Sequence, residues 1–283
     1  MTGGEVRAVL ARHGLAPSRE RGQNFLVDAR VAAELVEAAG VERGDSVIEI
    51  GTGLGILTRA LAERASRVET LEIDAGLVRA LRAESLLPPG VALRHADALA
   101  VDWAALVREC EATRVVANLP YAVSAPLLRA LLDLRGALRG WSVMIQRDVA
   151  DRLLAEPGSR SYSSLTVLHR LCVRARRVRD LAPGLFFPVP NVRSSFVRME
   201  PRADGVGAEE LARVERVVRA AFGQRRKTLA NALRGSGLAG ADGSAAAEWC
   251  KRAGIDPGAR AERLAPEAFL ALAREMAASG APA

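Results

Sequence analysis

The stretch SVIEIGTGLGILTRALAERA, residues 46–65, decides the fold. SVIEI (46–50) is a β-branched run typical of a buried strand, and ILTRALAERA (56–65) repeats apolar positions with helical spacing. Between them lies a glycine cluster, GTGLG (51–55), where the strand ends and the helix begins. Glycines at such a turn let the backbone come close to a ligand, although many α/β proteins use one for tight packing alone.

The same alternation of strand and helix continues on both sides of this stretch. ARVAAELVEAAG (29–40) predicts a helix that ends at Gly40. Further strands are predicted at 67–74, 91–99 and 114–119, helices at 75–86 and 125–134, and a strand followed by a helix over 141–154. Strands that alternate with helices predict a parallel sheet covered on both faces, with the carboxyl ends of the strands at one edge. We therefore expect a Rossmann-like α/β domain.

The pattern changes from about residue 161. LTVLHRLCVRARRVRDLAP (165–183) and SSFVRMEP (194–201) predict late strands, and PRADGVGAEE (201–210) predicts a linker. LARVERVVRAAFGQRRKTLANALR (211–234) and the segments after it predict helices, with a loop at 239–248. We expect the Rossmann-like domain to span residues 1–204 and a smaller, all-helical domain to span residues 205–283.

Composition indicates a basic globular protein. The 283 residues include 40 Lys and Arg against 33 Asp and Glu, a net charge of +7, which favours a polyanionic partner such as nucleic acid. A compositional preference for Ala and Arg would explain the choice of Arg over Lys, but not the positive excess. No apolar run reaches membrane-spanning length, and the charged N-terminus does not resemble a signal peptide, so we expect a cytoplasmic protein. The cysteines and histidines show no metal-ligand spacing: Cys110, Cys172, Cys250, His13, His95 and His169.

Three strand ends together predict a nucleoside pocket. The glycines have the spacing G-x-G-x-G, which differs from the G-x-G-x-x-G of dinucleotide sites. Glu72 ends the second strand, 21 residues after Gly51, where an acid accepts hydrogen bonds from both ribose hydroxyls. Asp97 ends the third strand and is expected to contact an adenine edge. Taken alone, Glu72 is equally consistent with a solvated carboxylate at the end of a strand.

The fourth strand runs into VVANLPYAVSAP (115–126). Pro120 favours an extended Leu119, so that the Leu119 carbonyl and the Asn118 side-chain oxygen would point together into the pocket beside Tyr121. Two acceptors beside an aromatic ring suit a planar base with an amino group, because accepting its N–H bonds favours a pyramidal nitrogen with an available lone pair. The alternative is a proline turn in which Asn118 caps a helix that begins near Ala125.

Seven motifs in order resemble the ribosomal RNA adenine dimethyltransferases of the small-subunit (16S) type. The NLPY motif itself is similar to the signature of methyltransferases that act on exocyclic amines. The motifs are RGQNFLVD (21–28), EIGTGLGILT (49–58), LEID (71–74), DA (97–98), NLPYAVSAP (118–126), FFPVPNVRSS (186–195) and FGQRRKTLANAL (222–233). The resemblance extends from about residue 13 to 275. Two positions depart from the family pattern, Thr52 where proline is common and Arg21 where an aromatic or aliphatic residue is frequent.

The resemblance implies a class I methyltransferase that uses S-adenosylmethionine and no metal. It implies cofactor contacts by Asn24, Leu26, Gly51, Gly53, Glu72, Asp97 and Asn118, and catalytic roles for Asn118, Leu119 and Tyr121. It implies that Tyr121 and Phe186 stack the target adenine and that Arg225, Arg226 and Lys227 contact RNA. These three cations lie in a helical pattern and cannot all face one side, and Arg174, Arg176, Arg177 and Arg179 offer a second basic segment. Arg21 is expected either to contact a phosphate or to lie in solvent.

The implied substrate is a pair of adjacent adenosines near the 3′ end of small-subunit rRNA, each dimethylated within an immature subunit by a monomeric enzyme with a role in subunit biogenesis. A large-subunit, antibiotic-resistance adenine methyltransferase shares the cofactor motifs, but QRRKTLANAL and GIDPGARAERL (254–264) favour the small-subunit group. A non-catalytic assembly factor is disfavoured by the intact NLPY, and a nucleotide-dependent oxidoreductase by the glycine spacing.

Overall fold

The computed structural model describes residues 1–18, 21–238 and 245–280, apart from the side chain of Tyr121. These residues form two compact units, one of residues 1–150 with 176–201 and the other of residues 151–175 with 202–283. The division into independent domains at residues 204 and 205 stays a prediction. Within the described residues, no helix is both long and apolar enough to cross a membrane.

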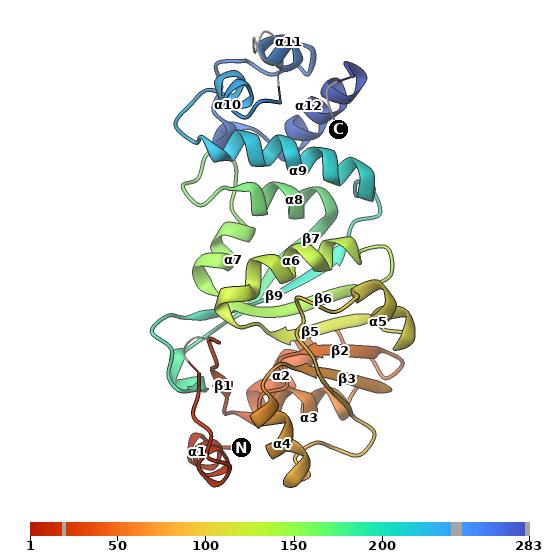
Figure 1. The fold of residues 1–283 in the computed structure, drawn as a ribbon, viewed down its shortest axis with the longest axis vertical. Coiled ribbons are helices and arrows are strands. Elements are labelled where there is room, and N and C mark those ends of the chain that lie inside the picture. The colour runs from red at the N-terminus through yellow and green to blue at the C-terminus, as the bar shows by residue number, and fades with distance from the viewer. Residues whose placement is uncertain (19–20, 239–244, 281–283) are drawn as a thin grey trace. The chain divides into compact units, whose positions relative to one another are not determined.

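The first unit is built on a seven-stranded sheet in the order β4-β3-β2-β5-β6-β9-β7 (Figure 1). β2 to β6 run parallel to one another, and β9 pairs antiparallel with β6. The strands are β2 (Ser46–Ile50), β3 (Arg67–Glu72), β4 (Ala92–His95), β5 (Arg114–Asn118), β6 (Gly140–Gln146), β7 (Val173–Leu181) and β9 (Ser194–Pro201). The predicted class I, Rossmann-like α/β fold is confirmed.

Four helices connect the parallel strands: α3 (Ile56–Ala62), α4 (Ala75–Ala83), α5 (Trp103–Glu109) and α6 (Ser124–Asp133). α2 (Ala29–Ala38) precedes β2, and α7 (Arg147–Leu153) follows β6. The apolar stripe of α2 and α3 packs on one face against Val47, Val116 and Phe196. Since β-α-β crossovers are right-handed, the reversal of strand order between β2 and β5 places the later helices on the other face. Such a reversal is where α/β proteins bind ligands.

The register of the sheet aligns the strand ends that matter. Ile50 pairs with Leu71 on one side and with Ala117 on the other, so the next residues, Gly51, Glu72 and Asn118, lie at one edge. The spacing of parallel strands therefore brings these three positions together without any contribution from the rest of the chain.

The N-terminal elements of this unit were not predicted. Helix α1 (Gly3–Arg12) begins with a capping box formed by Thr2 and Glu5. Strand β1 (Phe25–Leu26) pairs antiparallel with β8 (Phe186–Phe187), which follows a 3-10 turn, η2 (Pro183–Leu185). β1 and β8 have two residues each and lie far apart in the sequence, so neither shows a local pattern from which a strand could be predicted. α1 packs its buried Val6, Val9 and Leu10 against Phe25, Leu54 and Leu77.

The second unit is helical. It contains the end of α7, α8 (Ser164–Cys172), α9 (Ala208–Gly223), α10 (Leu229–Gly235), α11 (Ala245–Arg252), a 3-10 turn η3 (Ala261–Arg263) and α12 (Pro266–Ala278). Phe222 packs between Tyr162 and Phe269, with ring centroids 5.9 and 5.8 Å apart. These aromatic contacts join the segment before α8 to α9 and α12.

Two predictions in this region are wrong, and a third is wrong in part. Residues 165–172 form α8 rather than a strand, because Ser163 and Thr166 form a capping box and a nearly continuous apolar run does not distinguish strand from helix. Residues 225–227 form a turn, since α9 ends at Gly223. The predicted loop at 239–248 lies mostly outside the described residues, and its last four residues begin α11.

Candidate active site

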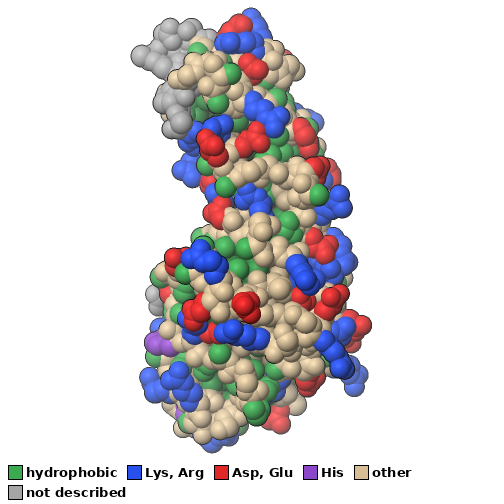
Figure 2. Space-filling model, turned by 90° about the vertical axis from the view of Figure 1, so that its right-hand side faces the viewer, with side chains coloured by type: hydrophobic (Ala, Val, Ile, Leu, Met, Phe, Trp, Pro, Cys, Tyr) green, Lys and Arg blue, Asp and Glu red, His purple; other side chains and the backbone are tan. Residues whose placement is uncertain are grey.

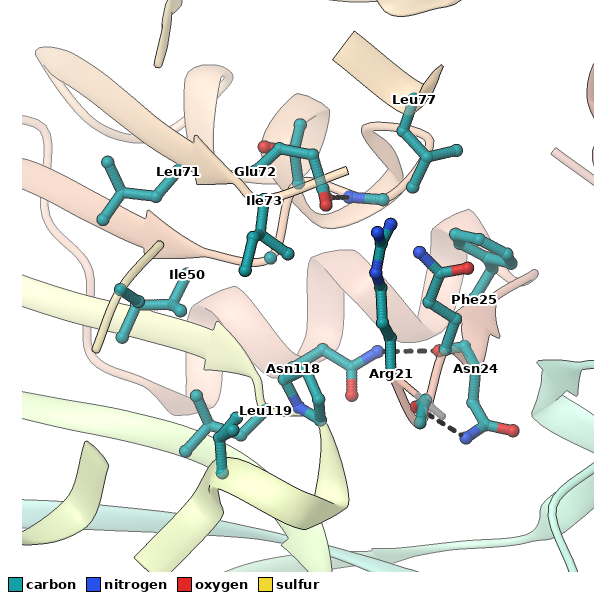
Figure 3. Close-up of a pocket in the computed structure, with 18 of the residues that line it drawn as sticks. Arg21, Asn24, Phe25, Ile50, Leu71, Glu72, Ile73, Leu77, Asn118 and Leu119 are labelled. Carbon is teal, nitrogen blue, oxygen red and sulfur yellow. Dashed lines mark hydrogen bonds between the residues drawn. The ribbon is translucent and has the colours of Figure 1, made fainter. Parts of the chain in front are cut away.

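A cavity of about 440 Å³ lies at the carboxyl edge of the parallel strands, at the reversal of strand order. Eight of the residues predicted to form the site line it together: Asn24, Leu26, Gly51, Gly53, Glu72, Asp97, Asn118 and Leu119. Figure 3 shows Glu72 and Asn118 entering it from different strands, with Asn24 opposite Asn118. The cavity lies wholly within the first unit.

The glycine turn between β2 and α3 requires glycine for two reasons. Gly51 and Gly53 have φ values of 82° and 56°, in the left-handed region that L side chains rarely adopt. A Cβ at Gly51 would lie 3.4 Å from the Asn118 carbonyl oxygen, and one at Gly53 would lie 3.1 Å from Phe25 Cδ1. The positive φ values therefore favour glycine at both positions, and at Gly53 a side chain would also crowd Phe25.

Glu72 holds the glycine turn in place. Its Oε2 accepts a hydrogen bond from the Gly53 N–H at 2.9 Å, and its Oε1 accepts one from the Asp74 N–H at 2.9 Å. Burial raises the pKa of Glu72, and the two N–H groups oppose this shift by stabilising the carboxylate. Each oxygen keeps a second lone pair, so the carboxylate can still accept hydrogen bonds from a ligand.

A second carboxyl, Glu49, lies beneath the turn and was not predicted as a functional residue. It is fully buried in β2, and its Oε2 accepts hydrogen bonds from the hydroxyls of Thr58 and Thr70, both at 2.6 Å. The Thr70 hydroxyl also lies 2.7 Å from that of Thr52, in the glycine turn. Burial raises the pKa of Glu49 to about 8. The feature of the sequence that could have indicated Glu49 is an acidic residue within the buried strand SVIEI.

Asn118 is held in one orientation by the N-terminal segment. Its Nδ2 donates to the Asn24 carbonyl oxygen at 3.0 Å, so its Oδ1 turns away from Asn24 (Figure 3). The next residue, Leu119, donates its N–H to the Met144 carbonyl at 3.0 Å. Asn118 does not cap a helix, because α6 has Val123 at its N-cap. This excludes the alternative in which Asn118 caps that helix.

Comparison with known proteins agrees with this geometry. Residues 17–278 match the model of the family described as ribosomal RNA adenine dimethylase. The chain is 41% identical to a ribosomal RNA small subunit methyltransferase A of Magnetococcus marinus, covering 99% of each chain. It is 40% identical to a protein of the same name from Geobacter metallireducens, covering 94% of this chain and 98% of the relative. The chain belongs to the ribosomal RNA adenine dimethylase family.

Two solved structures share the fold of this family member. A dimethyladenosine transferase from Plasmodium falciparum superposes with a TM-score of 0.73 at 24% identity, covering 91% of this chain and 98% of its own. The 23S rRNA methyltransferase ErmE superposes with a TM-score of 0.64 at 25% identity, covering 90% of this chain and all of its own.

The two departures from the family pattern have structural explanations. Thr52 joins its hydroxyl to the buried network of Thr70 and Glu49. The Arg21 Nη1 forms an ion pair with Asp74 Oδ2 at 2.6 Å, and Gln23 donates to the same oxygen at 2.9 Å. The Arg21 side chain is half exposed and lines the cavity, and its guanidinium is engaged in this ion pair. It holds the N-terminal segment against the N-cap residue of α4.

Two apolar residues of the cavity were missed. Ile73 is 47% exposed and Leu99 is 49% exposed, and both line the cavity beside the strand-end acids Glu72 and Asp97. Large apolar side chains exposed this far, at a concave surface, suit a flat apolar ligand. The available signal was a bulky apolar residue shortly after each acid, in LEID and in DAL.

The remaining predicted residues lie elsewhere or are not described. Phe186 is 3% exposed, packs in the core with Leu26 and does not line the cavity. Tyr121 begins the 3-10 turn η1 (Tyr121–Val123), but its side chain lies outside the described residues. Arg225, Arg226 and Lys227 belong to the second unit. Within the described part of the chain, no group of three or more His, Cys, Asp or Glu is arranged to hold a metal ion.

The raised pKa of Glu49 predicts how stability depends on pH. Between pH 4.5, the ordinary pKa, and about 8, the folded protein keeps a proton on Glu49 that the unfolded chain has lost. The free energy of unfolding should therefore fall as pH rises through this window, by about 1 kcal/mol per pH unit, and level off above it. Glu49→Gln should remove this part of the slope when urea unfolding is measured from pH 5 to 8.

The exposed Glu63, just after α3, offers a control, because Glu63→Gln should leave the slope unchanged. Parallel pH profiles for the wild type and Glu49→Gln would show that Glu49 is not protonated in the folded protein.

Proposed function

We propose that this protein transfers methyl groups from S-adenosylmethionine to the exocyclic amines of two adjacent adenosines near the 3′ end of small-subunit (16S) rRNA, giving dimethyladenosines. The observation that carries the proposal is the meeting of Asn118, Glu72 and the glycine turn in one cavity. The small-subunit substrate is supported by the names of the relatives that match nearly the whole chain at about 40% identity.

The cavity suits the proposed cofactor. Its volume of about 440 Å³ is in the range of cofactor sites, and Glu72 offers two partly used acceptor oxygens for ribose hydroxyls. Ile73 and Leu99 offer apolar surface for an adenine ring, and Asp97 lies beside Leu99 as the acceptor for its edge. When bound, S-adenosylmethionine supplies the methyl group as an electrophilic carbon on a sulfonium.

The residues around Asn118 prepare the target amine. The Asn118 Oδ1 and the Leu119 carbonyl are the proposed acceptors for the two amine hydrogens, and the bond from Asn118 Nδ2 to Asn24 fixes the acceptor end of the amide. Accepting both hydrogens directs the nitrogen lone pair away from the ring and towards the methyl donor. No general base is required, because the methylated cationic nitrogen readily loses a proton to water. The chain contributes mainly positioning.

Tyr121 and Phe186 are the proposed stacking residues for an adenine that has left its helix. Bases are commonly held in this way when an enzyme modifies them. Because Phe186 is buried, stacking on it requires its ring to be uncovered when RNA binds. The proposed partner is an immature small subunit, bound by a monomer in the cytoplasm, where subunits assemble.

One assay separates the proposal from its alternatives. The protein is incubated with labelled S-adenosylmethionine and either immature small subunits or large-subunit RNA, and dimethylated adenines are mapped as primer-extension stops. We expect two adjacent stops near the 3′ end of the small-subunit rRNA. Methylation confined to large-subunit RNA would favour the function of ErmE, whose fold is shared. Binding without transfer would indicate a non-catalytic assembly factor.

Replacing the proposed acceptor should stop the chemistry without unfolding the protein. In Asn118→Ala we expect single-turnover transfer, at saturating S-adenosylmethionine, to fall on the order of 100-fold or more, as when a hydrogen-bonding group that acts in the transition state is lost. Asn231→Ala, at an exposed position of α10, should transfer at the wild-type rate. Near-wild-type transfer by Asn118→Ala would exclude the acceptor role.

A further inference from the structure

A buried chain of hydrogen bonds, here called the hydroxyl chain, lies beneath the glycine turn and consists of Thr52, Thr70 and Glu49. Thr52 is in the turn itself, between Gly51 and Gly53, and lines the cavity. Thr70 in β3 and Glu49 in β2 are fully buried and are register partners in the parallel pair of these strands. The hydroxyl chain therefore leads from the wall of the cavity into the buried part of the sheet.

The direction of each bond in the hydroxyl chain follows from the number of hydrogens. Each threonine hydroxyl has one hydrogen to donate. Thr70 donates its hydrogen to Glu49 Oε2 at 2.6 Å. In its other bond it must therefore accept from Thr52, whose Oγ1 lies 2.7 Å from the Thr70 Oγ1. The bonds thus run in one direction, from the glycine turn to the carboxyl.

Hydroxyls alone hold the Glu49 carboxyl. Its Oε2 also accepts from Thr58 in α3 at 2.6 Å, and its Oε1 is buried without a hydrogen-bond partner among the described residues. Over the face shown in Figure 2, by contrast, Asp and Glu side chains commonly lie at the surface beside Lys and Arg. Glu49 is therefore placed as an acceptor for threonine hydroxyls and not as the partner of a cation.

Thr52 carries the only side chain between the two glycines that line the cavity. Gly51 and Gly53 have positive φ angles, and glycine has more conformational freedom than any other residue. The Gly51 and Thr52 N–H groups donate to the Leu71 carbonyl at 2.9 and 3.3 Å. The Gly53 N–H donates to Glu72. The Thr52 hydroxyl adds the one side-chain bond that residues 51–53 make.

Packing alone does not require these hydroxyls. Valine has the shape of threonine, and replacing a buried donor and its acceptor together by apolar groups of the same shape is often nearly neutral for stability. A buried network of hydrogen bonds instead fixes one arrangement of the groups that it joins. The position of the turn therefore explains the hydroxyl chain better than the stability of the core does.

We propose that Thr52 and Thr70 are positioning residues for S-adenosylmethionine, which hold the glycine turn against β3 through Glu49 and so fix the backbone that faces the cofactor. The inference rests on the proposed function, since it takes S-adenosylmethionine as the ligand of the cavity. The turn acts on this ligand through its own backbone and through Glu72, whose Oε2 accepts from the Gly53 N–H. A turn that is held in place beforehand loses less freedom on binding, which increases affinity.

A role in proton transfer is a weaker explanation of the hydroxyl chain. Neither Thr70 nor Glu49 is among the residues that line the cavity, so neither faces the reacting groups. The proposed methyl transfer also requires no general base. The hydroxyl chain thus acts on the reaction through the glycine turn.

The first test removes one buried hydroxyl at a time, with the matched pair Thr52→Val and Thr58→Val. Thr58 is also bonded to Glu49 Oε2, but it lies in α3 and not in the turn. The dissociation constant for S-adenosylhomocysteine is measured by calorimetry, and urea unfolding checks that both variants are folded. Thr52→Val should weaken binding about 5- to 10-fold, the effect of one lost hydrogen bond, and Thr58→Val less than about twofold. Equal affinities of the two variants would overturn the proposal.

The conservative variant separates the hydroxyl from the shape of the side chain. Thr52→Ser keeps the donor and should bind S-adenosylhomocysteine within about twofold of the wild type. Binding by Thr52→Ser as weak as that by Thr52→Val would overturn the proposal, because the methyl group would then be what matters.

A double variant tests whether the two threonines act as one unit. Thr70→Val breaks the hydroxyl chain in the middle and should weaken binding by the same factor as Thr52→Val. The double variant should bind no more weakly than either single variant, because the second substitution removes nothing that still acts. Losses that multiply in the double variant would overturn the proposal. Should Thr70→Val fail to fold, the comparison of Thr52→Val, Thr52→Ser and Thr58→Val still decides.

Steady-state kinetics separate positioning of the cofactor from a loss of folded protein. In Thr52→Val the KM for S-adenosylmethionine should rise by the same factor as the dissociation constant, with a smaller fall in kcat, because the lost contact acts on binding. A fall in kcat with an unchanged KM would overturn the positioning role.

Failure of this inference and failure of the proposed function give different results. A wild-type protein that binds S-adenosylhomocysteine but transfers no methyl group to any RNA would overturn the function and leave the affinity tests in force. Normal methyl transfer by the wild type, with equal affinities in Thr52→Val and Thr58→Val, would overturn the hydroxyl chain alone.

Discussion

A hydrogen bond between the Gly53 N–H and the Glu72 carboxylate joins the glycine turn after β2 to the end of β3, and the site depends on it. The turn has positive φ angles that only glycine adopts easily, and the Glu72 carboxylate is the partner of its Gly53 N–H. The parallel register places that partner one residue beyond Leu71, which pairs with Ile50. On the other side of β2, the same register brings Asn118 to the edge of the sheet. The register of the parallel strands thus brings a glycine turn, a carboxylate and an amide together at one edge of the sheet.

The site is prepared before any ligand binds. Asn118 is oriented by the Asn24 carbonyl, and Asn24 lies in a segment that Arg21 and Gln23 attach to Asp74 at the start of α4. Beneath the turn, Glu49 is neutral at pH values below about 8, because burial disfavours its charge, and it supports Thr58 and Thr70 rather than facing the cavity. Acceptors fixed in place by such contacts need little rearrangement when charge develops during the reaction.

Much of the fold and of the site could be predicted, because the signals are local. Four strands of the parallel sheet run into short motifs, and parallel strands bring such ends together, so Gly51, Glu72, Asp97 and Asn118 could be placed in one pocket. α8 could not, since its apolar run fits either period and only Ser163 marks a helix start. The partner of Arg21 could not either, because Asp74 lies 53 residues further along the chain. Contacts of that kind come from the packed fold and leave no motif.

The most direct test of the account is a crystal structure of the protein with S-adenosylhomocysteine bound. The account predicts that the two ribose hydroxyls donate to the Glu72 carboxylate, with the adenine ring between Ile73 and Leu99 at the edge of the sheet. A nucleoside bound away from Glu72, or outside the cavity lined by the glycine turn and Asn118, would contradict it.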